Sequence, residues 1–228
     1  MTTFDLINVY QFNYISTKYL SGLPSDCCSM VEEMNEIWEM YRVKGVSIDK
    51  VLEQCVCRRH GHQYCIPQNA VDEAKIALKG SKFVSASKEV PFIKPNDKFN
   101  ECFADFEQFY DFVASVIGNI TGIGPLTVYD TAKRIGHLFD VPIYPCQYVY
   151  INAGALDGAK ALLRRNNLKF REPIKDFEPH FGTFPSIFIE DILCIFKDSF
   201  STLPSVKLKD LLKKGNCVFK VEATPTII

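Results

Sequence analysis

Hydrophobic residues recur at helical spacing along most of the chain. In the segment 106–117 the apolar side chains lie three or four positions apart, as they do on the buried face of an amphipathic helix. A second pattern of this kind follows Pro125 and continues to Gly136. Apolar and polar residues alternate in CVFKVE at 217–222, which predicts a short strand. The pattern therefore predicts a mainly α protein with at most a short strand.

Residues that start and stop helices divide the rest of the chain. Gly45 and Gly80 are stop signals, and Pro67 is suited to the first turn of a helix. We expect further helices at 4–19, from Ser25 or Asp26 to Val43, from Ile48 onward, at 67–80, at 184–196 and at 206–212. The segment 81–100 lacks a helical period and contains two prolines, which favours a linker. This predicts a helical subdomain at 1–80 and a second subdomain at 101–228.

Composition narrows the class of protein. The chain has 228 residues, of which 47% are hydrophobic, and this is ordinary for a folded domain with a core. No basic stretch precedes an apolar run at the start, and acidic residues interrupt the most apolar segment, SIFIEDILCIF. We therefore expect a cytoplasmic protein without membrane contact. The nine cysteines are then expected to be thiols rather than a disulfide framework.

The two central helices are separated by a Gly-Ile-Gly turn. Gly122 and Gly124 have no Cβ, so the backbone can adopt a positive φ and approach a ligand closely. The exposed N–H groups at the start of the following helix favour an anion. We expect Gly122, Ile123 and Gly124 to bind phosphate through their amides, with the Thr121 hydroxyl beside them.

The segment Ile117–Gly136, IGNITGIGPLTVYDTAKRIG, resembles the helix-hairpin-helix motif of DNA-binding and DNA-repair proteins. The positions that match are the glycines and apolar residues of that motif, namely Ile120, Gly122, Ile123, Gly124, Val128, Ala132 and Ile135. The resemblance implies contact with the DNA backbone that does not depend on base sequence. Lys133 and Arg134 would then supply positive charge for the phosphates.

Two wider resemblances add little about activity. The segments GIGPLTVYDTAKRIG and VYINAGALDGAKALL resemble a recurring region of bacterial proteins that have no assigned activity. Base-excision DNA glycosylases also carry the hairpin, followed by a lysine and then by a catalytic aspartate. Here Leu126 stands at the lysine position, and the aspartate region is Ile143-Tyr144-Pro145. Enzymatic activity of the glycosylase type is therefore not expected.

A local basic patch follows the hairpin, although the formal net charge of the chain is only −1. Lys160, Arg164 and Arg165 extend the phosphate track or, alternatively, form a solvated helix face. The preceding residues 152–162 form a glycine turn and a helix of small residues. This segment is interpreted as a degenerate second hairpin.

A cluster of cysteine and histidine residues lies in the N-terminal half. Cys55, Cys57, His60, His62 and Cys65 offer the ligand types that zinc prefers. However, the cysteine spacing lacks a C-x2-C pair, so a helix end with buried thiols is the competing interpretation. Alternatively, Arg58, His60 and His62 hold a phosphate or an acidic substrate.

The sequence thus supports one leading hypothesis and two alternatives. The leading hypothesis is binding to the DNA backbone through the hairpin, with no cofactor apart from the zinc alternative. The second is an enzyme that acts on nucleic acid or on a phosphorylated substrate through Arg58, His60 and His62. The third is a protein-interaction module in which the hairpin is structural. The oligomeric state is left open.

Overall fold

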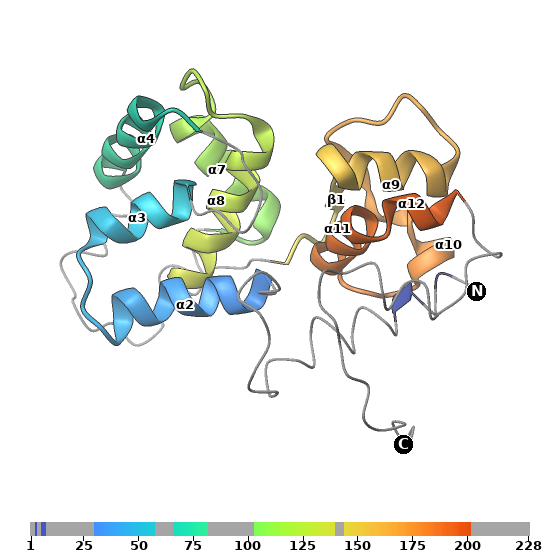
Figure 1. The fold of residues 1–228 in the computed structure, drawn as a ribbon, viewed down its shortest axis with the longest axis horizontal. Coiled ribbons are helices and arrows are strands. Elements are labelled where there is room, and N and C mark those ends of the chain that lie inside the picture. Colours follow the sequence, from blue (N-terminus) through green and yellow to red (C-terminus); the bar gives the residue numbers. More distant parts are fainter. Residues whose placement is uncertain are drawn as a thin grey trace.

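A computed structural model of the chain describes residues 3, 6–7, 30–57, 66–81, 103–139 and 144–201. Figure 1 shows two groups of helices with strand β1 between them. Each group is built around its own cluster of buried hydrophobic residues. The described part of the chain is mainly helical, as the sequence pattern predicts. None of the described helices has the length and apolar composition needed to span a bilayer.

The first lobe contains α2 (Met30–Arg42), α3 (Ile48–Cys57), α4 (Gln68–Gly80), α7 (Phe106–Ile117) and α8 (Pro125–Leu138). The apolar positions predicted for 106–117 are buried, and they pack α7 against α8 and α4. The Asp105 side chain accepts a hydrogen bond from the Gln108 amide at 2.9 Å, which caps the start of α7. These helices form one core.

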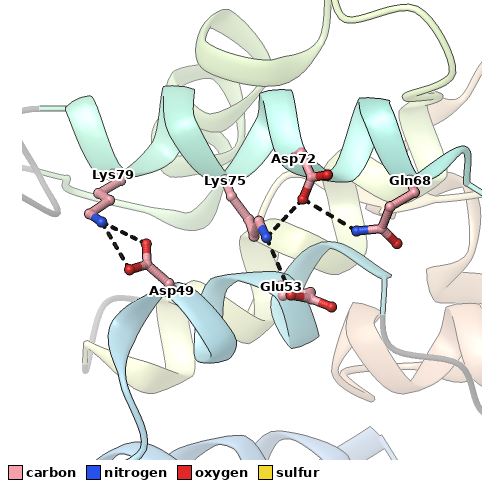
Figure 2. Close-up of polar contacts among 6 residues, drawn as sticks. All are labelled: Asp49, Glu53, Gln68, Asp72, Lys75 and Lys79. Carbon is pink, nitrogen blue, oxygen red and sulfur yellow. Dashed lines mark hydrogen bonds and ion pairs between the residues drawn. The ribbon is translucent and has the colours of Figure 1, made fainter.

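Charged side chains join the outer faces of α3 and α4 (Figure 2). The Lys79 ammonium lies 2.7 Å from Asp49, and the Lys75 ammonium lies 3.3 Å from Glu53 and 2.8 Å from Asp72. The Lys75 hydrogen bond lowers the pKa of Asp72 below its ordinary value. Because these groups are largely in contact with water, each pair contributes little to stability. The core already holds the two helices together, so these contacts add only a small amount to their association.

The second lobe contains α9 (Ala153–Leu163), the short helices η4 (Ile174–Asp176), α10 (Glu178–Phe181) and α12 (Lys197–Phe200), and α11 (Ser186–Ile195). Helices α9 and α11 pack extensively. A Cβ added at Gly158 would lie only 2.1 Å from the Leu193 carbonyl oxygen, and one at Gly154 would lie 2.8 Å from the Cys194 sulfur. Glycine is therefore required in α9 because the α11 backbone occupies the space of a side chain.

A small sheet joins the lobes. Strand β1 (Tyr148–Tyr150) pairs antiparallel with β2 (Arg171–Pro173), with Tyr150 opposite Arg171. Successive side chains of a strand point to opposite faces. Accordingly, Tyr150 enters the first core and stacks on Tyr129 at 4.6 Å between ring centroids, whereas Val149 enters the second core. One short strand thus contributes to both cores.

Glu107 anchors this junction to α7. Its buried carboxylate accepts hydrogen bonds from three successive backbone amides, those of Cys146, Gln147 and Tyr148, at 3.1, 3.0 and 3.4 Å. The Cys146 thiol also donates to it at 3.4 Å. Since a buried carboxylate is costly unless it is hydrogen-bonded, this arrangement explains why an acidic residue is tolerated on the apolar face of α7.

Several sequence expectations differ from the structure. The helices on both sides of 81–100 share one core, so the two cores do not follow the predicted division at 1–80 and 101–228. The sequence pattern did not predict the strands β1 and β2, which pair with each other in the structure. The predicted helices at 4–19 and 206–212, the strand at 217–222 and the linker itself lie outside the continuously described segments.

The interpretation of 152–162 as a second hairpin is wrong. Gly154 and Gly158 lie inside a continuous helix and face α11, rather than forming a turn. Likewise, α8 does not end at Gly136 but continues to Leu138. The Arg42 guanidinium donates to the Leu138 carbonyl oxygen at 3.2 Å, so α2 stabilises the last turn of α8.

Candidate functional site

The turn between α7 and α8 has the form of a tight helical hairpin. Gly122 has a φ of +97°, a conformation that a residue with a Cβ adopts only under strain. A Cβ at this position would also lie 3.1 Å from Pro67 and 3.4 Å from Ala70 at the start of α4. Gly122 is therefore required by the fold of the turn itself.

The two isoleucines of the turn hold it against the core. Ile120 and Ile123 are 9% and 7% exposed. The Ile123 amide donates to the Ile120 carbonyl oxygen at 3.0 Å, and the Ile120 amide donates to the Ile117 carbonyl oxygen at 3.1 Å. Ile123 therefore contributes its side chain to the core, and its N–H group is already used within the turn.

The first turn of α8 presents the donors that remain. Gly124 is the N-cap residue with φ −94° and ψ 170°, and Pro125 occupies the first turn. The N–H groups of Gly124, Leu126 and Thr127 form no hydrogen bond to another described residue. Nothing lies within 4 Å of the position that a Gly124 Cβ would occupy. In contrast to Gly122, Gly124 borders open space.

Thr121 lies at the exposed tip of the turn. The structure thus brings Thr121, Gly122 and Gly124 to one surface at the start of α8, a position that favours an anion. Ile123 does not belong to this surface, and its bonded N–H group contradicts the expectation that it contacts phosphate.

Lys133 and Arg134 do not belong to this surface. They are 5% and 8% exposed, and both lie in the middle of α8 rather than at its start. The Arg134 guanidinium donates to the Cys55 carbonyl oxygen at 3.0 Å. Lys133 lies 3.1 Å from Asp130 and 4.2 Å from the centroid of the Tyr129 ring. Their burial contradicts the expectation that they contact phosphate.

Lys133 instead belongs to a buried charged group between the lobes. Burial alone would lower its pKa, but the negative charges of Asp130, Glu190 and Asp191 outweigh this effect and raise it. Three carboxyl groups thus act on the pKa of one ammonium group, and Asp130 is paired with it directly. Burial, together with the charges of Asp191 and Asp130, raises the pKa of Glu190 to about 8, although Lys133 opposes this shift.

The buried charged group was not predicted from sequence. Glu190 interrupts the apolar segment SIFIEDILCIF. A carboxylate within a strongly apolar helix is the sequence feature that could have indicated its burial. Beside it, the Tyr129 hydroxyl is buried and has no hydrogen-bond partner among the described residues.

The predicted basic extension lies in the second lobe. Arg165 is engaged by Asp176 at 2.6 Å and is 3.9 Å from Glu172. Arg164 follows the last residue of α9 in a left-handed conformation with φ 54°. No ion pair joins Arg164 or Lys160 to another residue in the described part of the chain. Of the three, Arg164 and Lys160 thus retain an uncompensated charge within that part.

The predicted zinc cluster is described only in part. Cys55 is buried and Cys57 is half-buried at the end of α3. Residues 58–65, which include Arg58, His60, His62 and Cys65, lie outside the described segments. The zinc and enzyme alternatives therefore stay predictions.

Within the described segments, one other group of residues has the donor types of a metal site, namely Asp105, Glu107 and Cys146. The Glu107 carboxylate is already occupied by the amides of the junction. Asp105 caps α7, and its carboxylate accepts a hydrogen bond from the side-chain Nε2 of Gln147 at 3.1 Å. Burial, followed by the hydrogen bond to Glu107, raises the pKa of Cys146 to about 11. A protonated thiol and two engaged carboxylates make this group structural.

Comparisons of the chain with models of protein families, with curated proteins and with solved structures gave no match.

Proposed function

We propose that this protein binds the DNA backbone, without preference for base sequence, through the turn between α7 and α8. The observation that carries the proposal is the open start of α8. Its N–H groups at Gly124, Leu126 and Thr127 have no acceptor among the described residues, and no atom of those residues lies within 4 Å of the position of a Gly124 Cβ. A phosphate group can therefore approach the backbone to hydrogen-bonding distance.

The chemistry of these donors favours the phosphate backbone over the bases. Backbone N–H groups are the same at every residue, and phosphate oxygens carry no base information. The partial positive charge at a helix N-terminus adds attraction for an anion. Binding through this surface is therefore expected to depend on the shape of the DNA and the spacing of its phosphates.

The charge near the turn sets an expectation for affinity. Residues 118–127, GNITGIGPLT, contain no charged side chain. The turn alone then releases few counterions, so the affinity should fall only gently with salt. In Figure 1 the turn and the loop that follows α9 lie at the upper edge of the two lobes. Lys160 near the end of α9 and Arg164 directly after it would add to the attraction.

The test is a titration of isotopically labelled full-length protein with a short DNA duplex, followed by the amide resonances. We expect the largest shifts at Gly124, Leu126 and Thr127, because their N–H groups would receive the phosphate oxygens. The buried amide of Ile123 serves as an internal reference. Shifts confined to other surfaces would overturn the assignment of the turn, and the absence of any shift at low salt would overturn DNA binding.

A further inference from the structure

A cavity of about 670 Å³ opens in the second lobe, away from the α7–α8 turn. Its walls come from the end of α9, from η4, and from residues of α10 and α12. Cavities that hold small organic ligands have about 300–1,000 Å³. The size is therefore suited to a small molecule rather than to a single ion.

Positive charge converges on this cavity. Arg164, Arg165 and Lys175 line it, and Asp176 is the acidic residue among its lining groups. Asp176 is engaged by Arg165 at 2.6 Å. In contrast, neither Arg164 nor Lys175 forms an ion pair with another described residue. Two cations from different elements thus face the cavity without a described counter-charge.

The remaining wall combines a neutral polar group with apolar surface. Partial burial lowers the pKa of His180 below its ordinary value, which favours the neutral imidazole with one donor and one acceptor nitrogen. Leu162 and Phe200 also line the cavity; Phe200 belongs to the core of the second lobe, and Leu162 packs against that core. The cavity therefore offers cations, one neutral hydrogen-bonding group and an apolar wall.

We propose that this cavity binds a small organic phosphate. Its phosphoryl group would lie between Arg164 and Lys175, since charge-assisted hydrogen bonds to phosphate oxygens are among the strongest available to a protein. Its organic part would rest against Leu162 and Phe200. This site is distinct from the α7–α8 turn and does not require DNA binding, but it shares Arg164 with the cations that the proposed function expects to attract DNA.

A fluorescent probe tests the site directly. Full-length protein is titrated with N-methylanthraniloyl-ADP, which joins a diphosphate to an aromatic group, and inorganic pyrophosphate is added as competitor. Loss of one charge-assisted contact in Lys175→Gln should weaken probe binding about tenfold. Lys169→Gln is the matched control because Lys169 is an exposed cation of the same lobe that does not line the cavity. It should leave the affinity unchanged, and so should Gly124→Val.

Four results would overturn the proposal. The first is the absence of probe binding to the wild-type protein, and the second is an equal loss in Lys175→Gln and Lys169→Gln, which would indicate general charge attraction. The third is wild-type affinity in both Lys175→Gln and Arg164→Gln with a lowered melting temperature in Arg164→Gln. Arg164 would then only complement the dipole at the end of α9. If duplex DNA displaces the probe from the wild-type protein but not from Lys175→Gln, the cavity would be assigned to DNA instead.

Discussion

The segments that contain α8 and α9 both carry glycines and cations close together in sequence, but the structure exposes the glycine in one and the cation in the other. At the start of α8, Gly124 borders open space, whereas the cations in the middle of the helix are buried. In α9, Gly158 is pressed against the α11 backbone, whereas Arg164 after its last residue is exposed. A glycine and a cation close together in sequence therefore do not by themselves form an anion site. The packing of each helix decides which of them reaches the ligand.

The largest expected effect comes from filling the contact between α9 and α11. Gly158→Ala places a Cβ 2.1 Å from the Leu193 carbonyl oxygen, so the two backbones must separate. We expect a loss of about 3 kcal/mol or more in the free energy of unfolding, measured by urea denaturation. Gly80→Ala is the control, because nothing lies within 4 Å of that position, and it should be neutral or slightly stabilising. Equal stability of both variants would contradict the packing of these helices.

The buried charges of Lys133 in α8 and Glu190 in α11 should make stability depend on pH. The folded-state pKa of Glu190 is raised from 4.5 to about 8, so the folded protein holds a proton that the unfolded chain releases. Its stabilising contribution is complete below about pH 4.5 and is lost as the pH rises through about 8. Glu190→Gln has no carboxyl proton to release, so its melting temperature should fall less steeply between pH 4.5 and about pH 8. A fall of unchanged steepness in the variant would show that Glu190 is not the group responsible.

A smaller effect is expected at the strained glycine of the turn. Gly122→Ala must adopt a φ near +97° and meets Pro67 at 3.1 Å. Strain of this kind costs roughly 1–3 kcal/mol, so the melting temperature should fall by several degrees. Thermal unfolding followed by circular dichroism measures the change. An unaltered melting temperature would mean that the turn adopts another conformation.

The smallest effect on stability is expected at Gly124. Its φ of −94° is open to any residue, and no atom occupies the Cβ position. Gly124→Ala should therefore change the free energy of unfolding by less than about 0.5 kcal/mol. Urea denaturation of this variant beside Gly122→Ala compares the two glycines of one turn. A loss at Gly124 as large as that at Gly122 would contradict the separation of their roles.

The sequence was sufficient to predict the helices of the first lobe. The start of α7 and the Gly-Ile-Gly turn follow from local rules, because capping residues and glycines act within a few positions. The burial of Lys133 and Arg134 could not be predicted in this way. It depends on partners such as Cys55 and Glu190, which lie far away in sequence and approach only when the helices pack.

The second lobe was less predictable for a similar reason. The strands β1 and β2 are only three residues long, and their pairing is determined by contacts across the junction rather than by a visible alternation. The glycines of α9 have the local pattern of a turn, but the approach of α11 requires them in a helix. The cavity combines residues from four elements, and Lys175 and His180 gain their candidate role only from that assembly.

The central claim is that the start of α8 receives a DNA phosphate beside Gly124. The most direct measurement is fluorescence anisotropy with single-stranded, duplex and branched DNA across a salt series, for the wild-type protein, Gly124→Val and the control Gly80→Val. The account predicts that both variants fold, that Gly124→Val loses binding because its side chain blocks the phosphate, and that Gly80→Val binds as the wild type does. Undiminished binding by a folded Gly124→Val protein would contradict the account.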